Sequence, residues 1–152
     1  MEIVLVNPQI PQNTGSIART CAATNTKLHV VDPAFEISDS RAKRAGLDYW
    51  PYVDLEIHKT WEDYAQSSKR EAMWFFTKFA DKDLFEARFN APDILVFGSE
   101  TKGLGESFLS SYDKERQLRI SMPNPNVRSL NLSNAVNIGL YEAIRQVDFA
   151  NK

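Results

Sequence analysis

"DILVFGSETKGLG", from Asp93 to Gly105, joins a short apolar run to a loop that contains three glycines. The run 94–97 has no polar residue, which is typical of a parallel strand buried on both faces. Gly98, Gly103 and Gly105 allow close approach of the backbone and backbone angles that other residues disfavour. The stretch therefore predicts a central strand that ends in a tight loop, and this loop can bind a ligand mainly through backbone groups.

The same pattern of a strand followed by a polar loop recurs along the chain. Further strands are expected at 2–7, 27–33, 52–58, 71–77 and 117–123. Helices are expected between them at 15–25, 39–47, 60–68, 106–112 and 126–146, with one or two helical turns at 82–89. The first helix can be capped by Asn13 or Thr14, and the third by Thr60.

Strands that alternate with helices predict an α/β fold, a mostly parallel sheet with helices on both faces. Without repeats or linkers, residues 1–152 are expected to form a single domain. In such sheets, ligands bind at the carboxyl ends of the strands. Three loops rich in Gly, Pro, Asn and Ser are expected at that edge, at 7–15, 98–105 and 122–134.

The composition is that of a folded globular protein, with 43% hydrophobic and 25% charged residues. Cys21 is the only cysteine and cannot form an intrachain disulfide, which favours a reducing compartment. We find no signal peptide and no apolar run near the ~20 residues of a membrane span. These features predict a cytoplasmic protein without a membrane partner.

The charge pattern is balanced, with a net charge of −2. This balance argues weakly against a nucleic-acid partner, because phosphate binding depends on Lys and Arg. Basic residues are nevertheless grouped locally. "RAKRAG" contains Arg41, Lys43 and Arg44, and Lys69 is followed by Arg70.

Several enzyme classes fit the loops poorly. The first loop lacks G-x-G-x-x-G, and "GSETKG" does not match a P-loop, so neither nucleotide motif is present. Ser99 stands outside a G-x-S-x-G motif, and the only histidines, His29 and His58, lie in predicted strands. One cysteine and two separated histidines show no zinc-ligand spacing, so no metal is expected.

Three stretches together resemble the motifs of the SPOUT superfamily of RNA methyltransferases. They are "PQNTGSIARTC" (11–21), "LVFGSETKGLG" (95–105) and "RISMPNPNVRSLNLSNAVNIGLYEAIRQ" (119–146). Within the superfamily, the chain is most similar to the 2′-O-methyltransferases that act on the wobble nucleotide of tRNA. "GLG" ends the second motif where "GLP" is common, and Ser121 stands where a proline often occurs.

The resemblance implies a deep C-terminal trefoil knot, a homodimer, S-adenosylmethionine as cofactor and the anticodon region of tRNA as substrate. Asn13, Arg19 and Asn131 match the catalytic positions of the motifs. The residues expected to bind the cofactor, with Gly103 added from the glycine loop, are Phe76, Thr77, Gly98, Glu100, Gly103, Ile120, Met122 and Ser129.

An arginine is a poor general base because it stays protonated. We therefore expect Arg19 to hold a phosphate and to stabilise charge on the ribose 2′-oxygen. Asn13 and Asn131 are expected to orient Arg19 and the ribose. Three alternatives remain: methylation of another tRNA or rRNA site, a non-catalytic RNA-binding knot protein, and a binder of small nucleotides.

Overall fold

Seven parallel strands form one sheet in the computed structural model, which describes residues 1–37 and 49–149. The strands are β1 (Glu2–Val6), β2 (Lys27–Val31), β3 (Leu55–His58), β4 (Met73–Phe76), β5 (Lys82–Asp83), β6 (Ile94–Phe97) and β7 (Gln117–Arg119). Their order across the sheet is β3-β2-β1-β6-β4-β7-β5, and each neighbouring pair is parallel. Every residue of β4 and β6 is buried, as the unbroken apolar runs predict.

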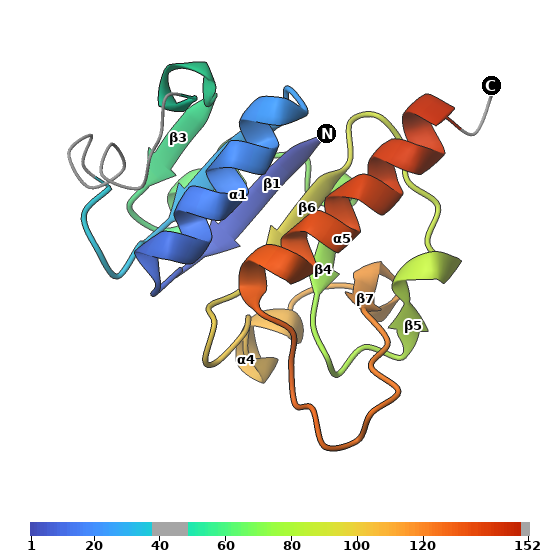
Figure 1. The fold of residues 1–152 in the computed structure, drawn as a ribbon. Coiled ribbons are helices and arrows are strands. Elements are labelled where there is room, and N and C mark those ends of the chain that lie inside the picture. The colour runs from blue at the N-terminus through green and yellow to red at the C-terminus, as the bar shows by residue number, and fades with distance from the viewer. Residues whose placement is uncertain (38–48, 150–152) are drawn as a thin grey trace.

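Helices cover both faces of the sheet, which confirms the predicted fold class. Helices α1 (Pro11–Ala23) and α5 (Leu132–Ile144) lie side by side over one face (Figure 1). The opposite face is covered by α3 (Trp61–Ser67) and α4 (Glu106–Leu109), whose Tyr64 and Leu109 join a second apolar core.

Helix α5 packs closely on the sheet through Gly139. A Cβ at this position would lie 2.9 Å from Phe76 Cζ and 3.3 Å from Phe97 Cζ. The two phenylalanine rings are stacked, with their centroids 4.3 Å apart. The missing side chain of Gly139 therefore allows α5 to approach the sheet closely.

Helix α1 begins earlier than predicted, and its predicted caps were wrong. It starts at Pro11, and Ile10 occupies the N-cap position without a side-chain hydrogen bond. Proline is favoured at the first position of a helix because it lacks the N–H that would stay unpaired there. Asn13 and Thr14 are buried inside the first turns instead.

Helix α5 begins later than predicted, at Leu132 rather than near Asn126. Asn131 is its N-cap, and its Oδ1 accepts hydrogen bonds from the backbone N–H groups of Ser133 (2.9 Å) and Asn134 (3.4 Å). Residues 126–130 are therefore a loop. Several Asn and Ser residues in this stretch could each have capped the helix, so the sequence pattern did not identify the one that does.

The remaining helix predictions had mixed outcomes. Thr60 caps α3, as predicted, by accepting a hydrogen bond from Asp63 N at 3.1 Å. Residues 82–89, predicted as one or two helical turns, contain a single 3₁₀ turn, Leu84–Glu86, and before it the two-residue strand β5, which was not predicted. The predicted helix at 39–47, with the basic residues of "RAKRAG", lies outside the described residues.

Cys21 is fully buried in the core of α1, and burial raises the pKa of its thiol to about 12. The thiol is thus a small core group. No helix in the described ranges is both long and apolar enough to span a bilayer.

Candidate active site

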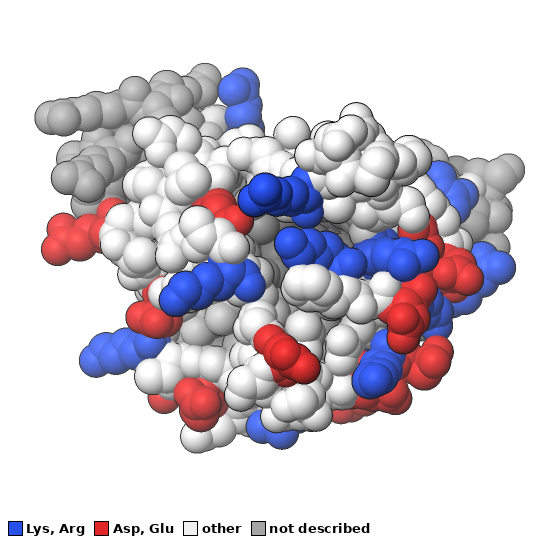
Figure 2. Space-filling view, turned by 90° about the horizontal axis from the view of Figure 1, so that it is seen from below, with Lys and Arg blue, Asp and Glu red and all other residues white. Residues whose placement is uncertain are grey.

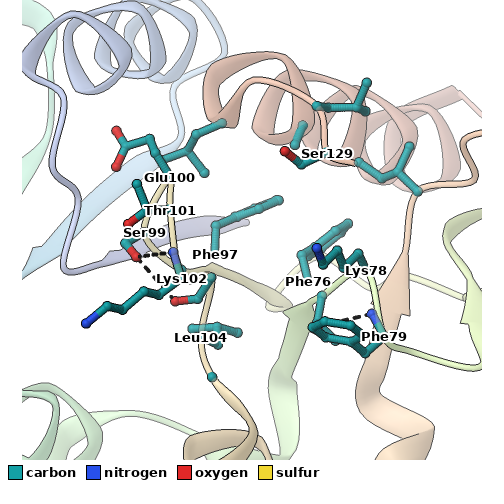
Figure 3. A pocket seen from close by; sticks show the side chains of 18 of the residues that line it. Phe76, Lys78, Phe79, Phe97, Ser99, Glu100, Thr101, Lys102, Leu104 and Ser129 are labelled. Atoms are coloured by element: carbon teal, nitrogen blue, oxygen red, sulfur yellow. Dashed lines mark hydrogen bonds between the residues drawn. The ribbon is translucent and has the colours of Figure 1, made fainter. Parts of the chain in front are cut away.

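A cavity of about 330 Å³ opens where β4, β6 and β7 end. Four segments surround it: the residues after β4, the loop after β6, the residues after β7 and the approach to α5 (Figure 3). Two of the three loops predicted at this edge line the cavity. The first loop, 7–15, does not line it, but contacts the loop after β6 from outside.

The loop after β6 is folded back on itself by its glycines. Ser99 and Gly103 exchange backbone hydrogen bonds of 3.2 and 3.0 Å. A Cβ on Gly98 would lie 2.0 Å from Gly103 C, and Gly103 and Gly105 have φ of 64° and 82°. Only glycine fits all three positions without strain, so this loop shape follows directly from the sequence.

All eight residues expected to bind the cofactor line this one cavity. Phe76 and Thr77 come from the end of β4, and Ile120 and Met122 follow β7. The apolar part of the wall includes Phe97, Leu118 and Leu132. These last three were not predicted, although their places at strand ends and at a helix start could have indicated them.

Two further residues that the sequence analysis missed stand at the rim. Lys78 and Phe79 follow β4 directly, and Phe79 is 80% exposed. Lys102 reaches the rim from the glycine loop. In the view from below, several basic side chains border a central hollow, and acidic side chains lie on both sides of the same face (Figure 2). Lys78 and Lys102 therefore place positive charge at the cavity, although the net charge of the chain is −2.

Asn13 and Asn131 meet beside the cavity although 118 residues separate them. Asn131 Nδ2 donates to Asn13 Oδ1 at 3.0 Å, and Asn13 Nδ2 donates to Glu100 Oε1 at 3.1 Å. Asn131 Oδ1 accepts from the α5 backbone, and the carboxylate of Glu100 can only accept. The linked hydrogen bonds are therefore donated in one direction, from Asn131 to Asn13 and from Asn13 to Glu100. The orientation of both amides is thereby fixed.

Glu100 links the cavity loop to the start of α1. Its Oε2 accepts from Gln9 N at 2.8 Å and its Oε1 from Ile10 N at 3.0 Å. An anion is favourable at a helix N-terminus, so Glu100 supplies from a distance the cap that α1 lacks. Its carboxylate lies on the side of the loop that faces away from Phe76 and Phe97 (Figure 3).

The pKa of Glu100 is lowered. Partial burial alone would raise this pKa, but the hydrogen bonds from Gln9 N, the Asn13 amide and Ile10 N outweigh burial. Glu100 therefore remains ionised and is committed to positioning Asn13. This geometry favours a positioning role over direct cofactor contact.

Arg19 lies apart from this network. It is exposed on α1, and its guanidinium carbon lies 5.3 Å from the centroid of the Tyr49 ring. Among the described residues, neither Asn13 nor Asn131 hydrogen-bonds Arg19, so orientation of Arg19 by the asparagines is not seen within one chain.

The Ser–His alternative has no geometric basis. Ser99 Oγ accepts a hydrogen bond from Lys102 N at 3.3 Å within the glycine loop. His29 and His58 lie on β2 and β3, on the far side of β1 from that loop.

The family is decided by comparison with known proteins. The model of the SpoU rRNA methylase family matches residues 1–141. The chain belongs to this family. Its SPOUT resemblance is thereby confirmed.

Two curated relatives match over nearly their full length. A tRNA (cytidine(34)-2′-O)-methyltransferase of Methylovorus glucosotrophus is 43% identical over 150 residues, covering 98% of this chain and 97% of the relative. One of the same name from Saccharophagus degradans is 42% identical over 149 residues, covering 97% and 96%.

Solved structures agree with these relatives. A structure described as giving insight into 2′-hydroxyl methylation of C/U34 on tRNA has a TM-score of 0.88 and 44% identity, covering 95% of this chain and 94% of that chain. The SpoU methyltransferase AviRb from Streptomyces viridochromogenes, in complex with AdoMet, has a TM-score of 0.80 and 26% identity. The match covers 96% of this chain and 60% of AviRb.

Proposed function

We propose that this protein transfers a methyl group from S-adenosylmethionine to the ribose 2′-hydroxyl of the wobble nucleotide of tRNA. The observation that carries the proposal is the position of the Asn13–Asn131 pair beside a cavity lined by all eight expected cofactor residues. The names of the full-length relatives support the same reaction and the same nucleotide.

The cavity suits this cofactor. Its volume of about 330 Å³ is within the range of small-molecule sites. The apolar side chains of Phe97, Leu118 and Leu132 fit a flat adenine ring, and the glycine loop offers close backbone approach. The Thr77 hydroxyl accepts from Phe79 N at 3.3 Å and keeps its own proton available for a ligand. The cofactor supplies an electrophilic methyl group when bound.

The chain's own residues then position the ribose. Glu100 holds Asn13, and Asn13 holds Asn131, so both amides meet an incoming hydroxyl with fixed orientation. Within the described residues, the cavity lining contains no histidine that could take the proton from the 2′-hydroxyl. We propose that Arg19 binds an RNA phosphate and stabilises the developing oxyanion. Lys78 and Lys102 at the rim suit further phosphate contacts, which position the RNA without reading its sequence.

The assembly proposed with this function is a cytoplasmic homodimer. Apolar side chains on the outer face of α5 support a contact surface, since Ile138 is 39% and Tyr141 56% exposed. A dimer would also pool the basic rims of two cavities for the anticodon region of tRNA. From the family resemblance we further propose that residues 1–152 form one domain and that its C-terminal part is a deep trefoil knot.

The test is methyl transfer from labelled S-adenosylmethionine to undermethylated tRNA, followed by digestion to nucleosides. Label is expected in a 2′-O-methylated pyrimidine, and Arg19→Ala should abolish it. Arg70→Ala is the matched control, because Arg70 is exposed just before β4 begins, at the other end of that strand. Cofactor binding without label in any tRNA would favour another RNA target or a non-catalytic RNA-binding protein. Absence of both cofactor binding and label in tRNA would contradict the proposal.

A further inference from the structure

We propose that His29, Glu56 and His58 form a binding site for a zinc ion at the β2–β3 edge of the sheet. The parallel register places His29 opposite Glu56 and Val31 opposite His58. One ligand atom from each of the three residues lies within 4.8 Å of the others. The pairing of β2 with β3 thus brings together two histidines that lie 29 residues apart, a spacing that did not indicate a metal site in the sequence.

The distances between the three side chains fit one small ion. His29 Nδ1 and His58 Nε2 are 3.0 Å apart. The Glu56 oxygens lie 3.8 Å from His29 Nδ1 and 3.9 Å from His58 Nε2. Ligands of tetrahedral zinc at ~2.0–2.1 Å are separated by about 3.3 Å, so small side-chain movements suffice. Two imidazoles and one carboxylate leave the fourth position to water.

Glu2 provides the outer hydrogen bond that is typical of a metal-binding histidine. Its Oε2 lies 3.1 Å from His29 Nε2, so this nitrogen carries the proton and Nδ1 keeps a lone pair directed toward His58. Without an ion, His58 Nε2–H must donate to His29 Nδ1. An ion takes the place of that proton, and His58 then carries its proton on Nδ1.

The surroundings favour a cation. Tyr64 packs against both imidazoles, with centroid distances of 4.9 and 5.1 Å, and covers the buried side of the cluster. Glu56 is half exposed and leaves the other side open to solvent. Lys27 Nζ contacts Glu56 Oε2 at 2.8 Å, which leaves Oε1 for the ion. The carboxylates of Glu2 and Glu56, less the charge of Lys27, give the empty site a net charge of −1 when both histidines are neutral.

The site is separate from methyl transfer. In the sheet order, β3 and β2 are divided from the cavity strands β6, β4 and β7 by β1. Its expected effect is structural, because an ion shared by His29 and the edge-strand residues Glu56 and His58 would fasten the four-residue strand β3 to β2.

The test is calorimetric titration of the chelator-treated protein with zinc chloride, with thermal unfolding measured in parallel. We expect one zinc ion to bind per chain and the midpoint temperature of thermal unfolding to rise with zinc concentration. Glu2→Gln should weaken zinc binding about 10–100-fold as an outer-shell change. His58→Gln and Glu56→Gln should weaken it further. Glu71→Gln, an exposed change elsewhere, is the matched control and should bind like the unchanged protein.

Circular dichroism of each zinc-free variant establishes that the variant is folded. Substitution of cobalt for zinc should give the visible spectrum of a tetrahedral nitrogen–oxygen site, and His58→Gln should remove it. Absence of stoichiometric zinc binding, or binding that His58→Gln leaves unchanged, would overturn the proposal. The histidine pair would then be an internal hydrogen bond that only joins β3 to β2.

Discussion

The N-termini of α1 and α5 lie next to each other but are stabilised in different ways. Asn131 caps α5 with its own side chain. Helix α1 has no local cap and instead receives the carboxylate of Glu100, about 90 residues away along the chain. The first arrangement is local, although several neighbouring Asn and Ser residues could have provided it, whereas the second exists only once the fold brings β6 beside β1. The Asn13–Asn131 hydrogen bond joins the two helix starts.

In this comparison, the largest expected loss of activity comes from Glu100→Gln, which removes the carboxylate that stabilises the start of α1. Glutamine replaces one acceptor oxygen with an NH₂ group, so at least one of the donors Gln9 N, Ile10 N and Asn13 Nδ2 loses its partner. Misplacement of Asn13 should lower kcat/KM for tRNA methylation by about 100-fold or more. Glu106→Gln, an exposed change at the start of α4, is the control. Equal activity in the two variants would remove Glu100 from the active site.

A second pair of variants separates the two roles of Asn131. Asn131→Asp keeps a good cap for α5, so unfolding stability should stay close to that of the unchanged protein. It cannot donate to Asn13, so methylation should fall strongly. Asn131→Ala should lose both activity and about 0.5–2 kcal/mol of stability. Chemical denaturation and kinetics of both variants test this, and full activity of Asn131→Asp would show that the donated hydrogen bond is dispensable.

The glycines of the two helices give a third contrast. Gly139→Ala in α5 would bring a Cβ against Phe76 and Phe97, and overpacking of this kind costs about 1–3 kcal/mol. Gly15→Ala in α1 meets nothing within 4 Å, so it should stabilise the protein by about 0.5–1 kcal/mol. Cofactor affinity should fall only in Gly139→Ala, because Phe76 and Phe97 line the cavity. If Gly139→Ala and Gly15→Ala changed the free energy of unfolding equally, the close packing of α5 on Phe76 and Phe97 would be contradicted.

The smallest expected effect is a difference in pH dependence. The folded-state pKa of Glu100 is lowered from 4.5, so its contribution to stability is present above pH 4.5 and is lost as pH falls through the folded pKa. The amide of Asn131 does not titrate. The stability gap between the unchanged protein and Glu100→Gln should therefore narrow below pH 4.5, whereas the gap for Asn131→Ala should persist. Denaturation between pH 3 and pH 7 measures both, and a constant gap for Glu100→Gln would argue against the lowered pKa.

These contrasts explain how far the sequence could predict the fold. Unbroken apolar runs identified β4 and β6 because both faces of a central parallel strand are buried. Thr60 identified the start of α3 because that cap is local. The start of α1 was misplaced because Glu100 acts from another loop, and β5 was missed because two residues carry no periodicity.

The candidate site was predicted from two different sources. The glycine loop followed from residue chemistry, since Gly98, Gly103 and Gly105 each meet a steric or backbone requirement. Most of the other cavity residues came only from the family resemblance, because no local pattern distinguishes Phe76 or Met122 from ordinary loop residues. The rim residues Lys78 and Phe79 escaped both approaches.

The Asn13–Asn131 hydrogen bond also bears on how the protein folds. Its 118-residue separation makes it a contact of high sequence distance, and such contacts slow folding because a long segment must be ordered first. During synthesis, the first asparagine leaves the ribosome long before its partner exists. The N-terminal half can order its strands early, but the Asn13–Asn131 hydrogen bond forms only when α5 docks. If the proposed function is correct, a chain without α5 lacks the asparagine pair and is inactive, whatever its N-terminal half has already folded.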